Sequence, residues 1–493
     1  MSLFIGADLG TSALKLLLVD EEGRILKSVS RSYPVEFPAA GWSQQDPSDW
    51  WEAFKGGIRE LIFDFDPQEI KAIGFGGQMH GLVALDGEDQ VIRPAILWND
   101  GRTASQTTYL NESIGKETLS HHTANIAFAG FTAPKLLWMR EQEPENFKKI
   151  AKIMLPKDYM NYRLTGVHTT DFSDASGMLL LDVRNRCWSE VMLKICGLHE
   201  SQMPKLFESF SPIGTLLPKV AAELGLSPQT IVAAGAGDNA AAAIGSGTIG
   251  AGKCNISLGT SGTIFISSAS FSVDPLNALH SFCHADGGWH LMGCILSAAS
   301  CNKWFCEEIL KTEDFAAEQK SITDEMLGKN DVFFLPYLMG ERSPINDTDA
   351  RGTFTGLRPD TARAEMLQAV LEGVAFAIRD NLEIAKAQGL RIERSGLCGG
   401  GARSPLWQKI LANILNLPLE IPVAEEGPGY GAAMLAMVAS GAYPKISECT
   451  EKFVKIQKTI APDPALAARY EEKYQKFKAI YPAMKDVFKK IKE

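Results

Sequence analysis

A carboxylate and two hydroxyl groups stand close together near the start of the chain. Asp8 ends an apolar stretch, and the turn Gly10-Thr11-Ser12 follows it, with Lys15 shortly after. A glycine-containing turn of this kind can aim backbone N–H and side-chain O–H groups at a phosphate. A carboxylate at the end of the preceding strand can hold Mg²⁺ beside that phosphate. The simpler alternative is an ordinary β-turn capped by Asp and Thr.

The same turn recurs about half the chain later. Leu-Gly-Thr-Ser occupies residues 9–12 and again residues 258–261, which include Gly259 and Thr260. Each copy lies between two short apolar stretches that are typical of β-strands. Because two such turns can hold a triphosphate from both sides, the repeat favours phosphate binding over a plain turn. It also predicts two domains of similar architecture that face each other.

A second carboxylate, Asp238, lies between a predicted strand and a predicted helix. Residues 235–240 match G-x-G-x-x-A, the fingerprint of dinucleotide-binding folds, so a nicotinamide-dependent dehydrogenase is one interpretation. However, Asp238 would repel the pyrophosphate, and the next strand ends without an acidic residue for the ribose. A carboxylate at a helix N-terminus can instead serve as a general base, because the helix dipole stabilises its charge. An N-cap role is the alternative.

Two further glycine-rich loops follow predicted strands. In residues 76–81, polar side chains between glycines could bond to a polyhydroxyl ligand, and the imidazole of His80 both donates and accepts hydrogen bonds. A glycine turn with a solvent-facing histidine is the alternative. The loop at 399–404 includes Gly400 and Gly401, so a flat ring or a phosphate could approach its backbone. By itself, that loop is equally consistent with a plain β–α connection.

Cysteine and histidine usage does not indicate a disulfide framework or a zinc centre. The nine cysteines are odd in number, irregularly spaced and without a C-x-x-C pair. His280, Cys283, His284 and His290 fit no closed zinc set. Free thiols indicate a reducing compartment, and the first residues lack the features of a signal peptide. We therefore expect a cytoplasmic protein.

The elements that must position these residues form an α/β pattern. Apolar runs at 3–9 and 13–20 flank the first turn, and runs at 254–258 and 263–268 flank the second. Strands followed by helices recur along both halves of the chain. This pattern predicts an α/β fold built from two similar domains.

Two alanine-rich helices mark the expected junction of the domains. One follows the loop that carries Asp238, and the other follows the loop at 425–431. Their small residues would allow close helix packing. We place the boundary so that residues 1–245 form an N-terminal domain and residues 246–493 a C-terminal domain. The last thirty or so residues have helical spacing and predict a surface helix on the second domain.

Length and charge restrict the classes of function. The chain has 493 residues, enough for two or three domains with real hydrophobic cores. Its net charge is −10 at pH 7, so a nucleic-acid partner that requires a basic face is not expected. No run of 18 apolar residues occurs, and we expect no membrane-spanning helix.

Taken together, these motifs resemble those of the FGGY carbohydrate kinases. The resemblance covers essentially the whole chain, and the two family signatures fit residues 130–142 and 352–373. The other matching motifs are DLGTSALK at 8–15, GWSQQDPSDWW at 41–51, GGQMHG at 76–81, PAILWNDGR at 94–102, LPKDYMNYRLTG at 155–166, GAGDNAA at 235–241, SLGTSG at 257–262, HSFCHA at 280–285, FLPYLMGER at 334–342 and GGGARS at 399–404.

The resemblance implies an actin-like fold, in which two ribonuclease-H-like α/β domains enclose the active site in the cleft between them. It implies that Asp238 is the catalytic base and that Asp8 engages Mg²⁺ at the phosphates. Met79, His80 and Asn239 would contact the sugar. The residues implied at the ATP phosphates and adenosine are Gly10, Thr11, Ser12, Lys15, Gly259, Thr260, Gly400 and Gly401. Asp100 and Arg102 would either support the sugar loop or form a structural ion pair.

The Gln-Met-His-Gly form of the sugar loop is similar to that of family members that act on D-xylulose. We therefore expect ATP- and Mg²⁺-dependent transfer of the γ-phosphoryl group to O5 of D-xylulose, with D-xylulose and ATP as partners and a homodimer left open. A kinase for D-ribulose, L-xylulose or gluconate is the nearest alternative. An actin- or Hsp70-like ATPase without a sugar substrate is a more distant one.

Overall fold

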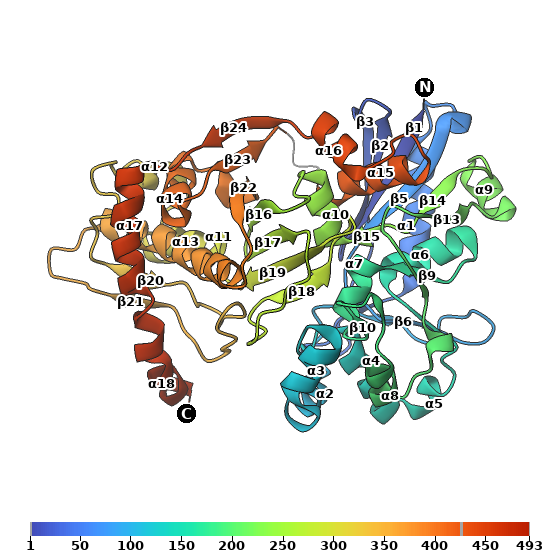
Figure 1. Ribbon diagram of the computed structural model, residues 1–493, viewed down its shortest axis with the longest axis horizontal. Helices are drawn as coiled ribbons and strands as arrows, with labels where there is room; N and C mark the ends of the chain where they lie inside the picture. Colours follow the sequence, from blue (N-terminus) through green and yellow to red (C-terminus); the bar gives the residue numbers. More distant parts are fainter. Residues whose placement is uncertain (1, 424–426, 493) are drawn as a thin grey trace.

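Two seven-stranded sheets organise the chain, one from each half of the sequence, and they lie side by side in the computed structural model (Figure 1). The structure describes residues 2–423 and 427–492. The first sheet contains β1 (Leu3–Leu9), β2 (Ala13–Asp20), β3 (Ile25–Ser32), β5 (Ile70–Gly77), β13 (Pro212–Thr215), β14 (Ile231–Ala233) and β15 (Ala236–Gly237). The second contains β16 (Gly252–Leu258), β17 (Gly262–Ser268), β18 (His280–Cys283), β19 (Trp289–Ile295), β22 (Ile392–Cys398), β23 (Leu419–Pro422) and β24 (Ile456–Ile460).

The two sheets share one topology. The first has the order β3-β2-β1-β5-β14-β13, and the second contains the order β19-β17-β16-β22-β23-β24. In both, successive neighbours pair antiparallel, antiparallel, parallel, parallel and antiparallel. This duplicated α/β arrangement confirms the fold class expected from the repeated turn, an actin-like pair of ribonuclease-H-like domains. The division at residue 245 stays a prediction.

The strands around both turns begin and end close to where the sequence places them. β1 and β2 coincide with the predicted runs, because alternating apolar residues and a tight turn determine a hairpin locally. The second alanine-rich helix, α15 (Gly427–Ala439), differs from the prediction. We expected a loop through Gly431, but these residues are already helical; residues 424–426 lie outside the described part.

The early start of α15 has a packing reason. α15 lies on the N-terminal sheet and against α10 (Asp238–Gly245), although it comes from the last part of the sequence (Figure 1). A Cβ on Gly74 would lie 2.2 Å from the carbonyl oxygen of Ala432, and one on Gly431 would lie 1.9 Å from that of Ala241. Both distances are shorter than van der Waals contact. Glycine is therefore required at these positions so that helix and sheet backbones can approach.

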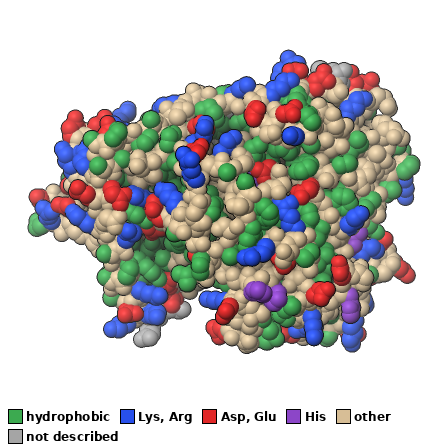
Figure 2. All heavy atoms as spheres, viewed as in Figure 1, with side chains coloured by type: hydrophobic (Ala, Val, Ile, Leu, Met, Phe, Trp, Pro, Cys, Tyr) green, Lys and Arg blue, Asp and Glu red, His purple; other side chains and the backbone are tan. Residues whose placement is uncertain are grey.

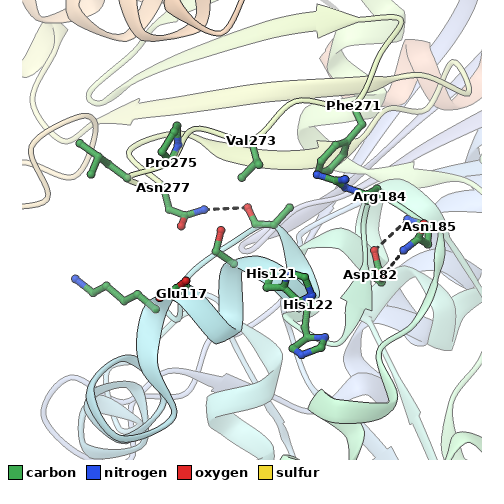
Figure 3. A pocket seen from close by; sticks show the side chains of 14 residues that line it. Glu117, His121, His122, Asp182, Arg184, Asn185, Phe271, Val273, Pro275 and Asn277 are labelled. Carbon is green, nitrogen blue, oxygen red and sulfur yellow. Dashed lines mark hydrogen bonds between the residues drawn. The ribbon is translucent and has the colours of Figure 1, made fainter.

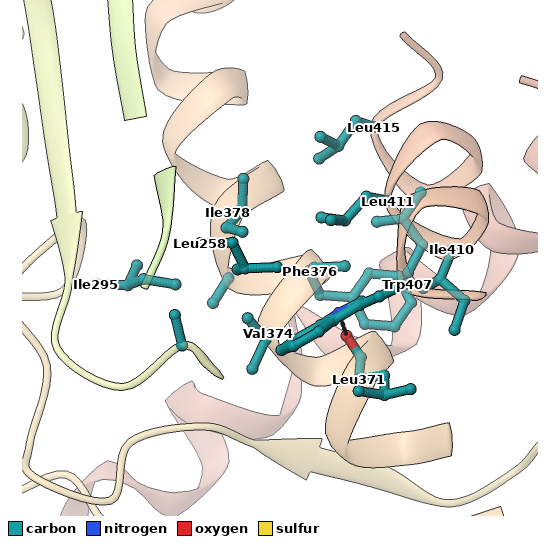
Figure 4. Packing of buried hydrophobic residues seen from close by; sticks show 14 of the residues in the cluster. Leu258, Ile295, Leu371, Val374, Phe376, Ile378, Trp407, Ile410, Leu411 and Leu415 are labelled. Carbon is teal, nitrogen blue, oxygen red and sulfur yellow. Dashed lines mark hydrogen bonds between the residues drawn. The ribbon is translucent and has the colours of Figure 1, made fainter. Parts of the chain in front are cut away.

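The core of the second half is built around a long helix. α13 (Arg363–Ala387) packs against α14 (Pro405–Leu415), and the indole of Trp407 donates a hydrogen bond of 3.0 Å to the carbonyl of Leu371 (Figure 4). The C-terminal segment forms two helices, α17 (Pro464–Phe477) and α18 (Ile480–Lys492), where we expected one. α17 buries Leu466, Tyr470, Tyr474 and Phe477 against this core.

The surface carries charge of both signs. Figure 2 shows acidic and basic side chains interspersed on the face in view. None of the helices formed by the described residues combines the length and the apolar character that a bilayer crossing requires.

Candidate active site

Three hydrogen bonds hold the first predicted phosphate turn, one within the turn and two from the side chains of Tyr33 and Trp98. The N–H of Gly10 donates to the carbonyl of Ala13 at 3.0 Å and closes the turn. Tyr33 donates its hydroxyl proton to the carbonyl of Gly10 at 2.5 Å, and the indole N–H of Trp98 donates to Oγ1 of Thr11 at 2.9 Å. The turn is thus a rigid element rather than a mobile loop. The side chain of the next residue, Ser12, is exposed.

Asp8 lies at the end of β1 directly before this turn. It pairs in register with Lys15 of β2, whose positive charge lowers the pKa of the carboxyl group. Burial acts more strongly in the opposite direction and raises the pKa of Asp8 to about 6. A poorly solvated carboxylate of this kind gains free energy when a cation binds beside it, so Asp8 fits the role of a Mg²⁺ ligand.

Three neighbouring strands bring the two predicted catalytic carboxylates to one edge of the first sheet. Asp8 of β1 lies opposite Gly76 of β5, and Gly237 of β15 lies opposite Gly77. Asp238 follows Gly237 directly and begins α10. The end of β1, the sugar loop after β5 and the start of α10 therefore meet at the same place.

Asp238 is half-buried and accepts two hydrogen bonds from the residue that follows it. The backbone N–H and the side-chain amide of Asn239 donate to Oδ1 at 2.7 and 3.0 Å. Burial, with a smaller contribution from the negative charge of Asp8, raises the pKa of Asp238 to about 7. A carboxylate that titrates near neutral pH is suited to accept a proton from a hydroxyl group. Asn239 also reaches the sulfur of Met79 at 3.9 Å, so the predicted sugar contacts lie together.

His80 presents a hydrogen-bond acceptor. Its Nδ1 lies 2.8 Å from the carbonyl oxygen of Gly177, which can only accept, so Nδ1 carries the proton and Nε2 has a free lone pair. Burial and the nearby charge of Lys135 lower the pKa of His80 to about 3. The ring is therefore neutral at physiological pH, and Nε2 can accept a hydrogen bond from a hydroxyl group.

Two residues that the sequence reasoning missed hold the sugar loop. His80 has a left-handed backbone, with φ of 69°. Its carbonyl oxygen accepts from Oγ1 of Thr132 at 3.0 Å and from Nζ of Lys135 at 2.7 Å. Both donors belong to α4 (Thr132–Gln142), and their spacing of three residues places them on one face of that helix. This spacing within the signature at 130–142 was the available signal.

The start of α10 is supported in a similar way. The N–H of Gly237 donates to Oγ of Ser173 at 3.2 Å, and this hydroxyl in turn donates to the buried carboxylate of Asp171. Lys157 lies 2.8 Å from the same Asp171 side chain and is itself buried. Sequence reasoning did not single out these residues, because their partners are distant in the sequence.

The remaining predicted ligands gather on the second half. Gly259 and Thr260 of the repeated turn and Gly400 and Gly401 of the glycine loop line one hollow of about 960 Å³. Its other lining residues are Ala299, Ser300, Asn302, Lys303, Phe315, Ala316, Gln319, Lys320, Arg403, Ser404, Pro405, Leu406 and Trp407. A volume of this size, with apolar walls, hydroxyl and amide groups and cations, is suitable for a nucleotide.

A hollow of similar volume, about 940 Å³, contains none of the predicted site residues. It lies between α3 (Lys116–Thr123) and a loop of the second half, where the side-chain amide of Asn277 donates to the carbonyl of Ala124 at 3.1 Å (Figure 3). Size alone therefore does not identify the active site, and the chemistry of the lining residues decides between the two hollows.

Asp100 and Arg102 form a buried ion pair of 2.8 Å, as one of the two interpretations predicted. The guanidinium group of Arg102 lies 4.0 Å from the ring centre of Trp42.

Among the described residues, no group of three or more His, Cys, Asp or Glu side chains is arranged to hold a metal ion. His280 and His284 instead bond to Arg342 and to the carbonyl of Thr248.

Comparison with known proteins places this geometry in a family. Residues 3–245 match the N-terminal domain of the FGGY family of carbohydrate kinases, and residues 254–440 match its C-terminal domain. The chain belongs to the FGGY family of carbohydrate kinases. It is therefore a kinase of a family that uses ATP to phosphorylate sugars, and not a dehydrogenase.

Individual members of the FGGY family match over nearly the whole chain. The xylulose kinase of Escherichia coli (strain K12) is 40% identical over 481 residues, which are 97% of this chain and 98% of that protein. The ligand-bound xylulose kinase of Lactobacillus acidophilus has a TM-score of 0.94 at 27% identity and covers 100% of both chains. The gluconate kinase of the same organism has a TM-score of 0.93 at 28% identity and covers 99% of both chains.

Proposed function

We propose that this FGGY kinase transfers the γ-phosphoryl group of ATP to O5 of D-xylulose and yields D-xylulose 5-phosphate and ADP. The observation that carries the proposal is the grouping of a half-buried carboxylate of raised pKa, Asp238, with Asn239 and the sugar loop of Met79 and His80. The E. coli xylulose kinase is 40% identical in an alignment that covers 97% of this chain, and this similarity supports D-xylulose as the acceptor.

The first half binds and activates the sugar. Nε2 of His80 accepts a hydrogen bond from one sugar hydroxyl, and Met79 and Asn239 contact the sugar beside it. Asp238 accepts the proton of the attacking 5-hydroxyl as O5 bonds to the γ-phosphorus. The donors of Asn239 keep the Asp238 carboxylate oriented for this step.

The phosphates of ATP lie between the two turns in this proposal. Gly10, Thr11 and Ser12, with Lys15 nearby, face them from the first half, and Gly259 and Thr260 face them from the second. The adenosine occupies the hollow that Gly400 and Gly401 line, where a Cβ on Gly400 would meet no atom within 4 Å and the backbone is open to a ligand. This arrangement directs the γ-phosphoryl group toward Asp238.

Asp8 would hold Mg²⁺ at the phosphates, because its carboxylate is poorly solvated and lies beside the first turn. When bound, the ion supplies positive charge that neutralises the phosphate oxygens during transfer. Approach of the two halves then aligns the sugar hydroxyl with the γ-phosphorus and excludes water, which would otherwise be the acceptor.

Phosphorus NMR of the product tests the proposal. D-Xylulose incubated with the enzyme and Mg–ATP is expected to give a phosphate monoester whose phosphorus couples to the two protons on C5. A phosphate on another carbon, or formation of inorganic phosphate alone, would refute the assignment of O5 as the nucleophile.

A kinase for a sugar acid is the second candidate, because the gluconate kinase of L. acidophilus matches the fold as well as the xylulose kinase does. We infer a cytoplasmic location from the nine cysteines, none of which forms a disulfide in the described structure.

A homodimer remains the open alternative to a monomer, and light scattering after size-exclusion chromatography distinguishes them.

A further inference from the structure

Arg342 carries a positive charge that no carboxylate neutralises in the described part of the chain. Its guanidinium group donates from Nη2 to Nε2 of His280 at 2.7 Å, while its Nε is buried without a hydrogen-bond partner. The carboxylate of Glu341 next to it is directed elsewhere, since Oε1 accepts the backbone N–H groups of Leu296 and Arg342 at 2.8 and 2.7 Å. Burying an unpaired cation is unfavourable unless an acceptor arrives to bind it.

Arg342 is connected to the sugar loop through a cluster of aromatic rings. Its guanidinium carbon lies 4.5 Å from the ring centre of Phe128, and His280 lies 5.1 Å from Phe128 and 5.5 Å from Phe131. Phe131 in turn stacks on His80 at 4.7 Å. The cluster therefore joins a cation of the second half to the sugar-binding histidine of the first.

The charge of Arg342 acts on the sugar loop. It contributes to the low pKa of His80, after burial and the charge of Lys135. The pKa of Asp238 is raised by burial and by the charge of Asp8, and that of Asp8 is raised by burial and lowered by Lys15. The aromatic contacts through Phe128 and Phe131 thus relate the guanidinium group to the sugar-binding histidine.

Arg342 and His80 offer opposite hydrogen-bonding capacity. An arginine can only donate, so it selects an oxygen that accepts, and a carbonyl oxygen is such a group. Nε2 of His80 can only accept, so it selects a hydroxyl group. A donor and an acceptor presented by one aromatic cluster match a hydroxyl next to a carbonyl, which is the C1–C2 end of a 2-ketose.

We propose that Arg342 is a specificity-determining residue, which donates to the C2 carbonyl of the bound ketose at the end opposite the hydroxyl that Asp238 activates. This inference rests on the proposed function, since it takes D-xylulose as the acceptor. Polyols present a hydroxyl at C2 instead, which accepts from the guanidinium group only when its own proton is directed to another acceptor.

The test compares D-xylulose with its two C2 reduction products, xylitol and D-arabitol. Wild-type enzyme, Arg342→Met, Arg342→Lys and the control Arg391→Met are assayed for kcat/KM with each acceptor; polyols that turn over too slowly are measured as competitive inhibitors. Arg391 is a suitable control because its side chain is 86% exposed. Thermal unfolding and the KM for ATP report whether each variant is intact.

Arg342→Met is expected to lower kcat/KM for D-xylulose about 10- to 100-fold and to change the values for the polyols by less than about threefold, because the carbonyl is a pure acceptor and depends on the charged donor more than a hydroxyl does. Arg342→Lys, which keeps the charge, is expected to lie between wild type and Arg342→Met. If Arg342→Met does not fold, Arg342→Lys is used to compare kcat/KM for D-xylulose with the values for the polyols.

Equal losses for ketose and polyols, or an unchanged preference in both variants, would overturn the inference. A wild-type enzyme that prefers gluconate to D-xylulose would also overturn it, because Arg342 would then serve a carboxylate. Failure of the proposed function gives a different result, namely no turnover of D-xylulose by the wild-type enzyme.

Discussion

Two half-buried carboxylates of raised pKa dominate the site at the scale of single residues. Asp238 has a pKa of about 7 and Asp8 a pKa of about 6, because burial disfavours their charged forms. A general base must be ionised, so kcat/KM with D-xylulose should rise with pH up to about 7 and then level off. If Asp238 had only a structural role, its ionisation would leave kcat/KM unchanged across this range.

Asp238→Asn should lower kcat about 10²- to 10⁴-fold, because the amide cannot accept the hydroxyl proton. The KM for ATP should change little, since the nucleotide hollow lies on the other half. Steady-state kinetics measure kcat and the KM for ATP, and circular dichroism checks that the variant is folded. A matched control is Asp182→Asn, whose carboxylate bonds to Asn185 beside the other hollow. Turnover near the wild-type value in a folded Asp238→Asn enzyme would refute the assignment of the base.

The same substitution should stabilise the fold at high pH. The folded protein raises the pKa of Asp238 from 3.8 to about 7, so it binds the proton more tightly than the unfolded chain does. Wild-type stability therefore falls as pH rises between these values, by up to a few kcal/mol. Asp238→Asn lacks this loss. Urea unfolding without Mg²⁺ at pH 5 and pH 8 should show a larger advantage of the variant at pH 8, and an equal difference at both pH values would contradict this.

Some site residues were predictable from the sequence and others were not. Asp8, Asp238 and His80 stand in short motifs whose residue types already suggest phosphate, base and sugar chemistry. Arg342 is a single arginine in FLPYLMGER without such a local pattern. Only tertiary structure brings it to His280 and Phe128, with no carboxylate paired to it among residues 2–423 and 427–492.

At the scale of elements, the sugar loop depends on α4. Thr132→Val removes the hydroxyl that donates to the carbonyl of His80 but keeps the shape of the side chain. The loss of one hydrogen bond should raise the KM for D-xylulose about fivefold and leave the KM for ATP unchanged. Thr108→Val, at an exposed position of α2 (Ala104–Thr108), serves as the control. A parallel rise of both KM values would show general damage instead.

The packing of α15 on α10 gives a second prediction at this scale. Gly431→Ala would place its Cβ 1.9 Å from the carbonyl oxygen of Ala241, so the fold should lose at least about 1–3 kcal/mol of stability. Gly56→Ala in α1 (Pro47–Leu61) meets no atom within 4 Å and should add about 0.5–1 kcal/mol. Chemical unfolding of both variants measures the difference. Similar effects of the two substitutions would contradict the close-packing role of Gly431.

Elements with strong local signals were predicted well. The strands of the two turns coincide with the predicted apolar runs to within two residues, because each is determined by its own residues. The start of α15 was predicted too late, since glycines usually indicate a loop. There they serve a long-range contact between backbones that the local sequence does not reveal.

At the scale of the whole molecule, the repeated turn was enough to predict two similar domains, and the matching sheet topologies confirm it. The exchange of elements between the halves was not predictable. α15 and α16 (Ile446–Phe453) come from the end of the chain yet pack with the first sheet, and β18 shares a core with residues of the first half. The contact between α15 and α10 confirms the close packing expected of the two alanine-rich helices. The placement of α15, α16 and β18 on the first half joins residues far apart in the sequence, and no local pattern encodes it.

The central claim is that the molecule couples ATP turnover to one kind of sugar. ADP release with Mg–ATP is measured without sugar and with D-xylulose, D-ribulose, L-xylulose, gluconate or glycerol. We predict strong stimulation by D-xylulose, weak or no stimulation by the other acceptors and little ADP release without sugar. Stronger stimulation by another acceptor would contradict the proposed specificity. ADP release that no sugar changes would contradict the assignment of a sugar kinase.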